Sequence, residues 1–264
     1  MRSVPRSRPT KLASLLLLLA AACATRTKAP SGATPATARA QPGGTVAGAP
    51  VPSCHWLASP AELAQGLTDA RLAATRAPSD RAAAFALARC THLHADVERD
   101  DARAVALSEE GMAALDRAAL PADDAESAYL YAVNLGLYLR ARGMMAVARL
   151  SELVGKLKVA VVAPALDDGG PLRVLGLLYV KAPGWPVGPG DLDAALELLH
   201  RAVREYPDHP LNHLYLAYAL VDAGERGQAR TELTRARELC QAGRFGGWAA
   251  RWHEEADQLM NRTR

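Results

Sequence analysis

The chain has 264 residues, with 31 Lys and Arg against 28 Asp and Glu, a formal net charge of +3 and a hydrophobic fraction of 50%. That hydrophobic fraction excludes a wholly disordered chain, because enough apolar surface is present to offset the entropy of ordering. The near balance of charge argues against a dedicated nucleic-acid binder, which would carry a surplus of Lys and Arg on one face. Four Cys are too few for a small disulfide-built scaffold.

Residues 1–22 have the pattern of an export signal. A positively charged start, with Arg2, Arg6, Arg8 and Lys11, precedes an apolar run. That run of eleven uncharged residues, Leu12 to Ala22, is too short for a membrane-spanning helix, which takes about 20 residues. The pattern predicts a signal peptide that is removed on export.

Cys23 directly follows Ala20-Ala21-Ala22, and the segment resembles the lipobox of bacterial lipoproteins. In such a box the Cys thiol is acylated and the chain is cut ahead of it; the usual Leu stands one place early here, at Leu19. Acyl chains hold firmly, since each buried CH₂ contributes about 0.8 kcal/mol. Ala24 replaces the Asp that favours inner-membrane retention, so we expect an outer-membrane lipoprotein that faces the periplasm. Ordinary cleavage after the Ala run, with Cys23 unmodified, is the alternative.

Residues 24–53 contain no acidic residue and no sustained apolar pattern. Their Ala, Thr, Pro, Gly and Ser content is typical of a flexible tether, so residues 23–53 are expected to link the lipid to a folded body at 54–264. The signal holds four positive charges and the tether three, with no negative ones, so the body carries +3 − 4 − 3 = −4. The apparent basicity of the chain therefore lies outside its folded part.

Beyond Pro60 the sequence predicts an all-α fold. Apolar residues recur at spacings of three and four, and the alternation typical of strands is missing. Pro and Gly breaks divide the body into about ten helical segments. A short side-chain oxygen can accept hydrogen bonds from the free amides of a helix's first turn, which defines an N-cap. The expected N-caps are Ser79 or Asp80, Asp123 or Asp124, and Asp191.

A repeat of 34 residues is the clearest pattern in the chain: Ala195, Leu199 and Ala202 return at Ala229, Leu233 and Ala236. It resembles the tetratricopeptide repeat, a helix–turn–helix unit in which small residues let paired helices approach. A degenerate copy contains Leu135-Gly136, with Glu152 in the place of Leu233, and a weaker one covers residues 80–120. We therefore expect a tetratricopeptide-like solenoid of about four helix pairs, with a C-terminal capping helix from Gly247 to Asn261. An irregular helical bundle with chance spacing is the alternative.

One repeat carries seven extra residues, because Tyr179 to Ala195 spans 16 positions where Leu220 to Ala229 spans 9. The insertion lies in the loop from Lys181 to Asp191, which is rich in Pro and Gly and contains Trp185. Insertions on a solenoid often lie on the binding face. The candidate contacts for a ligand or partner are Tyr179, Trp185, Pro186 and Asp191. Alternatively, Trp185 fills a gap between helix pairs and the loop is only a connector.

The same region resembles a known family. The motifs are Gly169-Gly170-Pro171, Leu175-Gly176, Ala182-Pro183-Gly184-Trp185-Pro186, Gly188-Pro189-Gly190-Asp191 and Tyr206-Pro207-Asp208. Over Asp168 to Ala236 the chain resembles the T-component family of TRAP transporters, the TatT-like lipoproteins. The resemblance implies a periplasm-facing lipoprotein of paired helices. It also implies a partner, the solute-binding protein of a tripartite, ATP-independent transporter for small organic, often acidic, ligands.

Histidine and cysteine spacings do not predict a metal site. The run that contains Cys90, His92 and His94 lacks a second Cys pair, and Pro210 separates His209 from His213. Structural or surface roles are expected for these side chains.

Three Cys would remain outside the lipid anchor, namely Cys54, Cys90 and Cys240. In an oxidising compartment they allow at most one disulfide within the chain. We prefer the pair Cys54–Cys90, which would attach the start of the body to the first helix pair.

No motif in the sequence predicts catalysis or a cofactor. Adjacent acidic residues such as Asp167-Asp168 are expected at solvated faces or loop caps rather than as an acid/base pair. The leading hypothesis is a lipid-anchored module that docks a periplasmic solute-binding protein or another envelope protein, with a possible homo-oligomer and no nucleic acid. One alternative is an envelope assembly scaffold with a polar groove for peptides or proteins, and another is a small-molecule carrier. An apolar channel lined by the first helices of the pairs would favour the first or the third hypothesis.

Overall fold

The structure, a computed structural model, describes residues 54–143 and 148–263. The predicted signal peptide, Cys23 and the predicted tether lie outside the described residues. The helices are α2 (Pro60–Arg76), α3 (Arg81–Val97), α4 (Asp101–Ala118), α5 (Ala125–Arg142), α6 (Leu150–Ala160), α7 (Gly170–Lys181), α8 (Leu192–Glu205), α9 (Pro210–Asp222), α10 (Arg226–Gln241) and α11 (Gly246–Arg262). These ten helices, with no strand in the described ranges, confirm the predicted all-α, helix-pair solenoid.

Short acidic side chains begin the helices where the sequence predicts. The carboxylates of Asp80, Asp124 and Asp191 each accept a hydrogen bond from the backbone N–H three residues on, at the starts of α3, α5 and α8. Such caps satisfy amides that have no partner inside the helix. The sequence reading did not include Ser59, which forms a reciprocal capping box with Glu62 at the start of α2.

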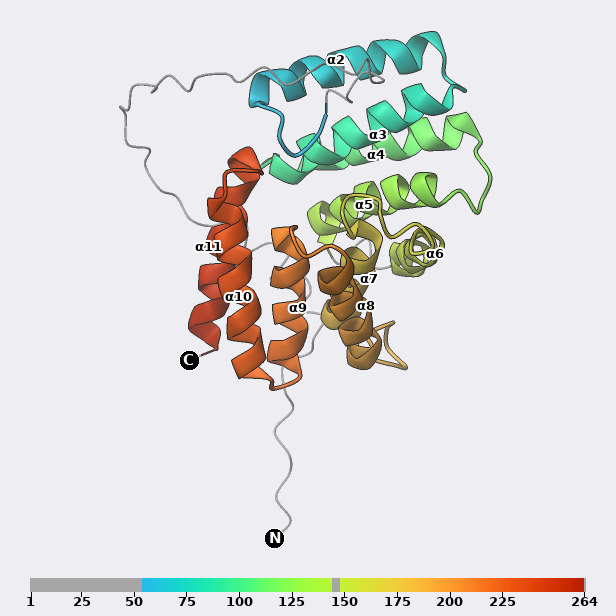
Figure 1. The fold of residues 1–264 in the computed structure, drawn as a ribbon. Coiled ribbons are helices and arrows are strands. Elements are labelled where there is room, and N and C mark those ends of the chain that lie inside the picture. Colours follow the sequence, from blue (N-terminus) through green and yellow to red (C-terminus); the bar gives the residue numbers. More distant parts are fainter. Residues whose placement is uncertain (1–53, 144–147, 264) are drawn as a thin grey trace, which may run out of the picture.

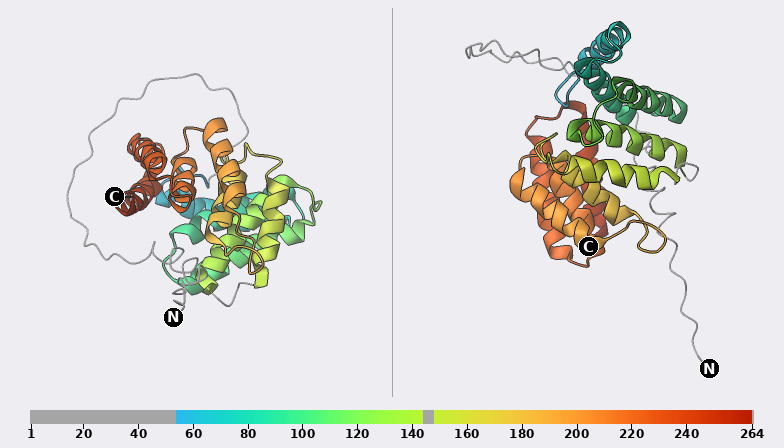
Figure 2. Two further views of the ribbon diagram at one scale, coloured as in Figure 1. Left: turned by 90° about the horizontal axis from the view of Figure 1, so that it is seen from below. Right: turned by 90° about the vertical axis from the view of Figure 1, so that its right-hand side faces the viewer.

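Consecutive helices pack side by side through the whole body. Helices α2, α3 and α4 form one end, α5 to α8 follow, and α9 to α11 form the other end (Figure 1). The stacked layers are seen most clearly in the right-hand view of Figure 2. The loop between α7 and α8 projects away from this stack.

Close helix packing explains the repeat pattern. A Cβ atom at Gly176 would lie 2.6 Å from Cγ of Leu199, so only Gly lets α7 approach α8 at this point. Leu199 and its counterpart Leu233 are both fully buried. The degenerate copy differs, because a Cβ atom at Gly136 would meet nothing within 4 Å. In that copy Glu152 is half-buried rather than in the core, which explains why an acidic side chain can replace the Leu.

Helix α11 does more than cover the last pair. It packs on α10 and α9, and it also reaches α3 at the other end of the body. The indole N–H of Trp248 donates to the Asp96 carboxylate over 3.0 Å, and Arg251 forms an ion pair with the same carboxylate. Trp56, which precedes α2, packs edge-on against Trp248 and Trp252, with ring centroids 5.2 and 5.3 Å apart. The two ends of the described body therefore meet.

Candidate functional site

A cavity of about 250 Å³ lies in the interior of this arrangement. Its wall comes from α3, α5, α6, α7, α9 and α11, together with Trp56 and Asp167 from loops. Most of its lining side chains are apolar; they include Val133, Leu137, Leu153, Val174, Leu177, Leu178, Leu211 and Trp252. Helices α3, α5, α7 and α9 are the first members of the four pairs. The cavity is therefore an apolar space bounded mainly by the first helices.

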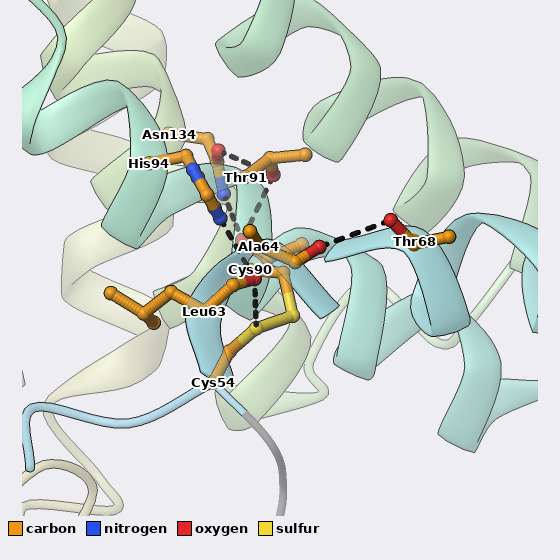
Figure 3. The surroundings of a disulfide bond; sticks show 9 residues. Cys54, Leu63, Ala64, Thr68, Cys90, Thr91, His94 and Asn134 are labelled. Carbon is orange, nitrogen blue, oxygen red and sulfur yellow. Dashed lines mark hydrogen bonds between the residues drawn. A yellow bond between two sulfur atoms is a disulfide. The ribbon is translucent and has the colours of Figure 1, made fainter. Parts of the chain in front are cut away.

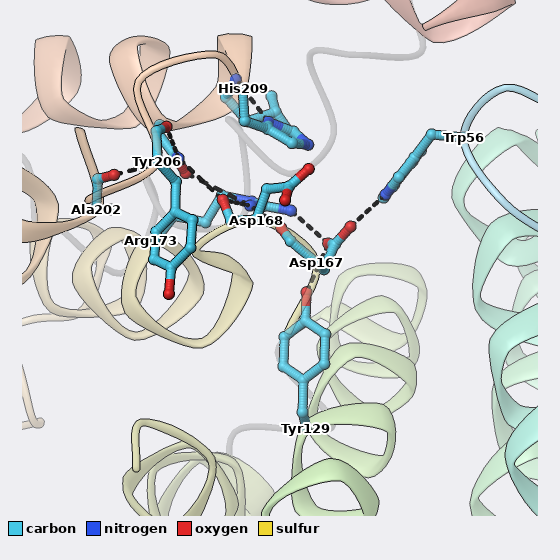
Figure 4. A network of polar contacts seen from close by, with 10 residues as sticks. Trp56, Tyr129, Asp167, Asp168, Arg173, Ala202, Tyr206 and His209 are labelled. Carbon is cyan, nitrogen blue, oxygen red and sulfur yellow. Dashed lines mark hydrogen bonds and ion pairs between the residues drawn. The ribbon is translucent and has the colours of Figure 1, made fainter. Parts of the chain in front are cut away.

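Asp167 is the centre of a polar network on the cavity wall (Figure 4). Its carboxylate accepts hydrogen bonds from the Trp56 indole N–H at 2.6 Å and from the Tyr129 hydroxyl at 2.8 Å. It also forms an ion pair with Arg173, whose side chain is 2% exposed. The sequence expectation of a solvated or loop-capping Asp167 is wrong, because Trp56 and Tyr129 from two distant segments and the nearby Arg173 enclose its carboxylate.

The backbone around Asp167 is shaped to hold Arg173. Asp167, Asp168 and Gly169 have positive φ values of 52°, 47° and 90°. This left-handed region is sparsely used, and Asp and Gly enter it more readily than most residues. The turn directs the carbonyl oxygens of Asp167 and Asp168 at one guanidinium nitrogen of Arg173, over 2.6 and 3.1 Å. The loop thus satisfies a buried cation with both backbone and side-chain oxygens.

Charge pairing decides the protonation of Asp167. Burial alone would raise the pKa of this carboxyl, but Arg173 and the hydrogen bonds from Trp56 and Tyr129 outweigh it and hold the pKa below its ordinary value. Burial, together with the neighbouring Asp167 charge, raises the pKa of the Tyr129 hydroxyl, which stays protonated. The Asp167 carboxylate is therefore the acceptor and the Tyr129 hydroxyl the donor of their hydrogen bond.

A second charged cluster is centred on Asp96. This carboxylate pairs with Arg140 at 3.3 Å and with Arg251, and it accepts from Trp248. Burial opposes ionisation of Asp96, but the two guanidinium groups outweigh it and lower its pKa. Arg140 also donates to the carbonyl oxygen of Ala95 over 3.0 Å. One carboxylate here balances only half of the charge of its two arginine partners.

Lys181, at the end of α7, is the third charged feature of the wall. Its Nζ lies 3.6 Å from the ring centroid of Tyr218, in a cation–π contact. The Tyr218 hydroxyl donates to Glu255 over 2.8 Å. Burial lowers the pKa of Lys181 from the ordinary 10.5 to about 8, and burial raises the pKa of Glu255.

The Lys181→Met variant should remove a pH dependence of stability. Because the pKa of Lys181 falls from 10.5 unfolded to about 8 folded, the unfolded chain binds more protons between these values. In that interval the free energy of unfolding of the native chain should rise by about 1.4 kcal/mol per pH unit relative to Lys181→Met. At pH values below this interval the charged ammonium of Lys181 destabilises the fold, so Lys181→Met should be more stable than the native chain. Urea titrations across the interval measure this, and parallel pH curves would contradict it.

The predicted contact residues lie outside the cavity. Trp185 is 90% exposed on the projecting loop, so the alternative that it fills a gap between pairs is wrong. Pro186 beside it is exposed as well. The Asp191 carboxylate caps α8. The backbone N–H of Asp191 donates to the carbonyl oxygen of the half-buried Tyr179 over 3.2 Å. The structure therefore places Trp185 and Pro186 at the tip of the loop and the other two at its base.

Cys54 and Cys90 form a disulfide, the pair preferred from the sequence, with Cα atoms 5.1 Å apart (Figure 3). The bond attaches the start of the described body to α3, two residues before Trp56. Cys240 is a buried free thiol.

His209 and His213 each have a structural contact, although His209 Nε2 is buried without a hydrogen-bond partner. His209 is the N-cap of α9, and His213 contacts the Glu232 carboxylate at 2.6 Å and the carbonyl oxygen of Pro207 at 2.8 Å. In the described part of the chain no group of three or more His, Cys, Asp and Glu is placed to hold a metal ion.

Comparison with known proteins found one family model that matches part of the chain. A family model for the tetratricopeptide repeat matches residues 187–239. Over this stretch the chain is similar to tetratricopeptide repeats. The match runs from the projecting loop through α8 and α9 into α10, and it includes both sets of the 34-residue register. Solenoids of such helix pairs present extended surfaces to other proteins, so the match supports a protein–protein interaction module.

A search of curated proteins found no significant match to the chain. Within residues 54–143 and 148–263, no helix is both long and apolar enough to cross a membrane.

Proposed function

We propose that this protein is a lipid-anchored, periplasm-facing module that docks a solute-binding protein and shares its small organic ligand. It would thus resemble the T-component of a TRAP transporter. The observation that carries the proposal is the apolar cavity bounded by the first helices of the pairs. A peptide-binding scaffold would be expected to present a polar groove, whereas a concave apolar space suits a small organic molecule.

The anchor belongs to the same proposal. Residues 1–22 would direct export, and Cys23 would carry the lipid that holds the protein at the outer membrane. The tether of about thirty residues would let the body reach roughly 30 Å from that anchor. The disulfide between Cys54 and Cys90 agrees with an oxidising compartment such as the periplasm.

The projecting loop is the proposed docking element. Trp185 and Val187 are exposed by 90% and 69%, so the loop presents two large apolar side chains close together. Tryptophan is enriched among the residues that dominate binding energy at protein interfaces. Hydrogen bonds hold the base of the loop, including one of 2.8 Å from the Gly190 N–H to the Pro183 carbonyl oxygen. The loop would therefore present its apolar tip with little loss of entropy on docking.

The Trp185→Ala variant tests the docking role. After cross-linking of intact cells and purification on this protein, the yield of complex should fall about tenfold or more, as for an interface hot spot. Leu72→Ala is the matched control, because Leu72 is also exposed but lies on α2 at the far end of the body. Both variants should keep the helical circular dichroism of the native chain. Equal yields for Trp185→Ala and Leu72→Ala would refute docking through the loop.

A further inference from the structure

The described residues contain three lysines, Lys156, Lys158 and Lys181, in different surroundings. Of the three, Lys181 alone lines the cavity. Lys158 is exposed on α6. Nζ of Lys156 lies 4.5 Å from the centroid of the Tyr131 ring, in a cation–π contact. Lys181 therefore differs from the other two in which molecules can reach its amine.

The Lys181 amine is placed against apolar and aromatic groups. Leu177 and Leu178 precede it by one turn of α7, and both line the cavity. Nζ of Lys181 lies 3.6 Å from the centroid of the Tyr218 ring. Tyr215, one turn earlier on α9, also lines the cavity. A molecule in this part of the cavity would therefore meet hydrocarbon and aromatic walls together with a primary amine.

The charges that act on Lys181 come from α9 and α11 and are balanced. Asp222 and Glu255 favour the ammonium, and Arg262 opposes it. The two carboxylates act through space, and no carboxylate among the described residues forms an ion pair with Lys181. Lys181 and Arg262 thus face two acidic groups. This corner of the wall has no surplus of positive charge, so it favours a neutral molecule over an anion.

Burial decides how much of the Lys181 amine is neutral. It disfavours the ammonium more than Asp222 and Glu255 favour it, and the pKa of Lys181 falls from 10.5 to about 8. At pH 7 about one amine in ten is then neutral, against about one in 3,000 at a pKa of 10.5. The neutral amine is the form that attacks a carbonyl carbon, and lysines desolvated in apolar pockets serve in Schiff-base chemistry.

We propose that the cavity captures a small neutral aldehyde by reversible formation of an imine with Nζ of Lys181. The amine lone pair forms a bond to the carbonyl carbon, both amine protons leave with the carbonyl oxygen as water, and a C=N double bond remains. The step needs no oxidant or reductant, and addition of water releases the aldehyde again. This inference rests on the proposed function, because it uses the same cavity, and it adds a class of ligand.

The volume of the cavity limits the size of the aldehyde. An apolar cavity of about 150 Å³ holds benzene, which has six non-hydrogen atoms. At the same density the 250 Å³ found here accommodates roughly ten such atoms. Benzaldehyde, with eight, is therefore a suitable probe.

Reductive trapping on the full purified chain at pH 7 tests the proposal. Cyanoborohydride reduces the imine of benzaldehyde to a stable benzylamine, which peptide mass spectrometry assigns to a residue. Lys181 should be labelled at least about tenfold faster than Lys156 and Lys158, because more of its amine is neutral. The rate at Lys181 should saturate with benzaldehyde, and benzyl alcohol, which cannot form an imine, should compete. Equal labelling rates at the three lysines would overturn the proposal.

Formaldehyde distinguishes capture in the cavity from reactivity of the amine alone. It is too small to gain from the apolar wall, whereas the ring of benzaldehyde gains from burial. The preference for Lys181 over Lys158 should therefore be at least about tenfold greater with benzaldehyde than with formaldehyde. Equal preferences for the two aldehydes would overturn capture in the cavity.

Variants place the aldehyde in the cavity. Val174→Phe puts a larger side chain on the wall and should slow benzaldehyde labelling of Lys181 about tenfold. Formaldehyde labelling of Lys181 should stay unchanged, which shows that the surroundings of the amine are intact. Lys158→Met is the control and should change neither rate at Lys181. Equal benzaldehyde labelling of Lys181 in Val174→Phe and Lys158→Met would contradict the placement.

Calorimetry with benzyl alcohol separates failure of this inference from failure of the proposed function. If benzyl alcohol binds while Lys181 is labelled no faster than Lys158, imine formation is overturned and the cavity remains a site for small molecules. If benzyl alcohol does not bind and labelling does not saturate, the small-molecule role of the cavity in the proposed function is overturned as well.

Discussion

Replacement of Arg173 with Met is expected to lower the free energy of unfolding by about 3–5 kcal/mol. The Arg173 side chain is 2% exposed and pairs with a carboxylate that is itself only 16% exposed. Loss of the guanidinium leaves the Asp167 charge without a cation and removes the donor of the Asp167 carbonyl oxygen, whereas the Asp168 carbonyl oxygen keeps the Asn212 side-chain amide as a donor. The cost of breaking such a pair is large because the remaining charge stays buried. Urea denaturation followed by circular dichroism measures the change.

Two further variants separate this explanation from a general effect of losing an arginine. Arg201→Met removes a surface ion pair with Glu205 at 2.7 Å and should cost no more than about 0.5 kcal/mol. Adding Asp167→Asn to Arg173→Met removes the uncompensated charge and should recover part of the loss. An Arg173→Met protein as stable as Arg201→Met would show that the Asp167 network does not hold the fold together.

Loss of the disulfide should be the second large effect. Cys54 and Cys90 are 36 residues apart in sequence. Closing a loop of this length restricts the unfolded chain by about 3–4 kcal/mol, so reduction or a Cys54→Ala/Cys90→Ala double variant should destabilise the protein by that amount. The bond also holds the segment that carries Trp56 over the cavity. Its loss should therefore loosen the indole hydrogen bond to Asp167 and shift the tryptophan fluorescence.

Cys240 provides the control for this prediction. A Cys240→Ala protein keeps the disulfide, so reduction should still destabilise it, whereas the double variant should not respond to reductant. Mass spectrometry under non-reducing conditions, after alkylation of free thiols in the unfolded chain, counts the bonds directly. Alkylation of Cys54, Cys90 and Cys240 together would mean that the protein has no disulfide.

Local signals in the sequence were sufficient to predict the helices. Asp80, Asp124 and Asp191 cap the helices that follow them, and a residue's role as a cap depends only on its immediate neighbours. The repeat pattern likewise predicted that small residues let paired helices approach, and Gly176 does so, with Leu199 of the paired helix as its close neighbour. Fold class and repeat architecture therefore followed from spacing.

The cavity wall was not predictable in the same way. The Trp56–Asp167 bond joins residues 111 positions apart, and the Arg251–Asp96 pair joins residues 155 positions apart. Both depend on how far the solenoid curves, which small rotations between pairs determine and no local pattern encodes. In sequence, Asp96 stands close to Glu98 and Asp100 and looks like part of a solvated acidic stretch. Only the return of α11 to α3 makes Asp96 a buried partner of two arginines.

The identity of the molecule that contacts Trp185 decides whether the projecting loop docks a solute-binding protein. A photoactivatable phenylalanine derivative placed at position 185 of the full chain can be activated in intact cells, and the cross-linked protein can be identified by mass spectrometry. We expect a periplasmic solute-binding protein at position 185, and no such product when the same probe is placed at position 72 on α2. A secretion or assembly component at position 185, or products that do not differ between the two positions, would contradict it.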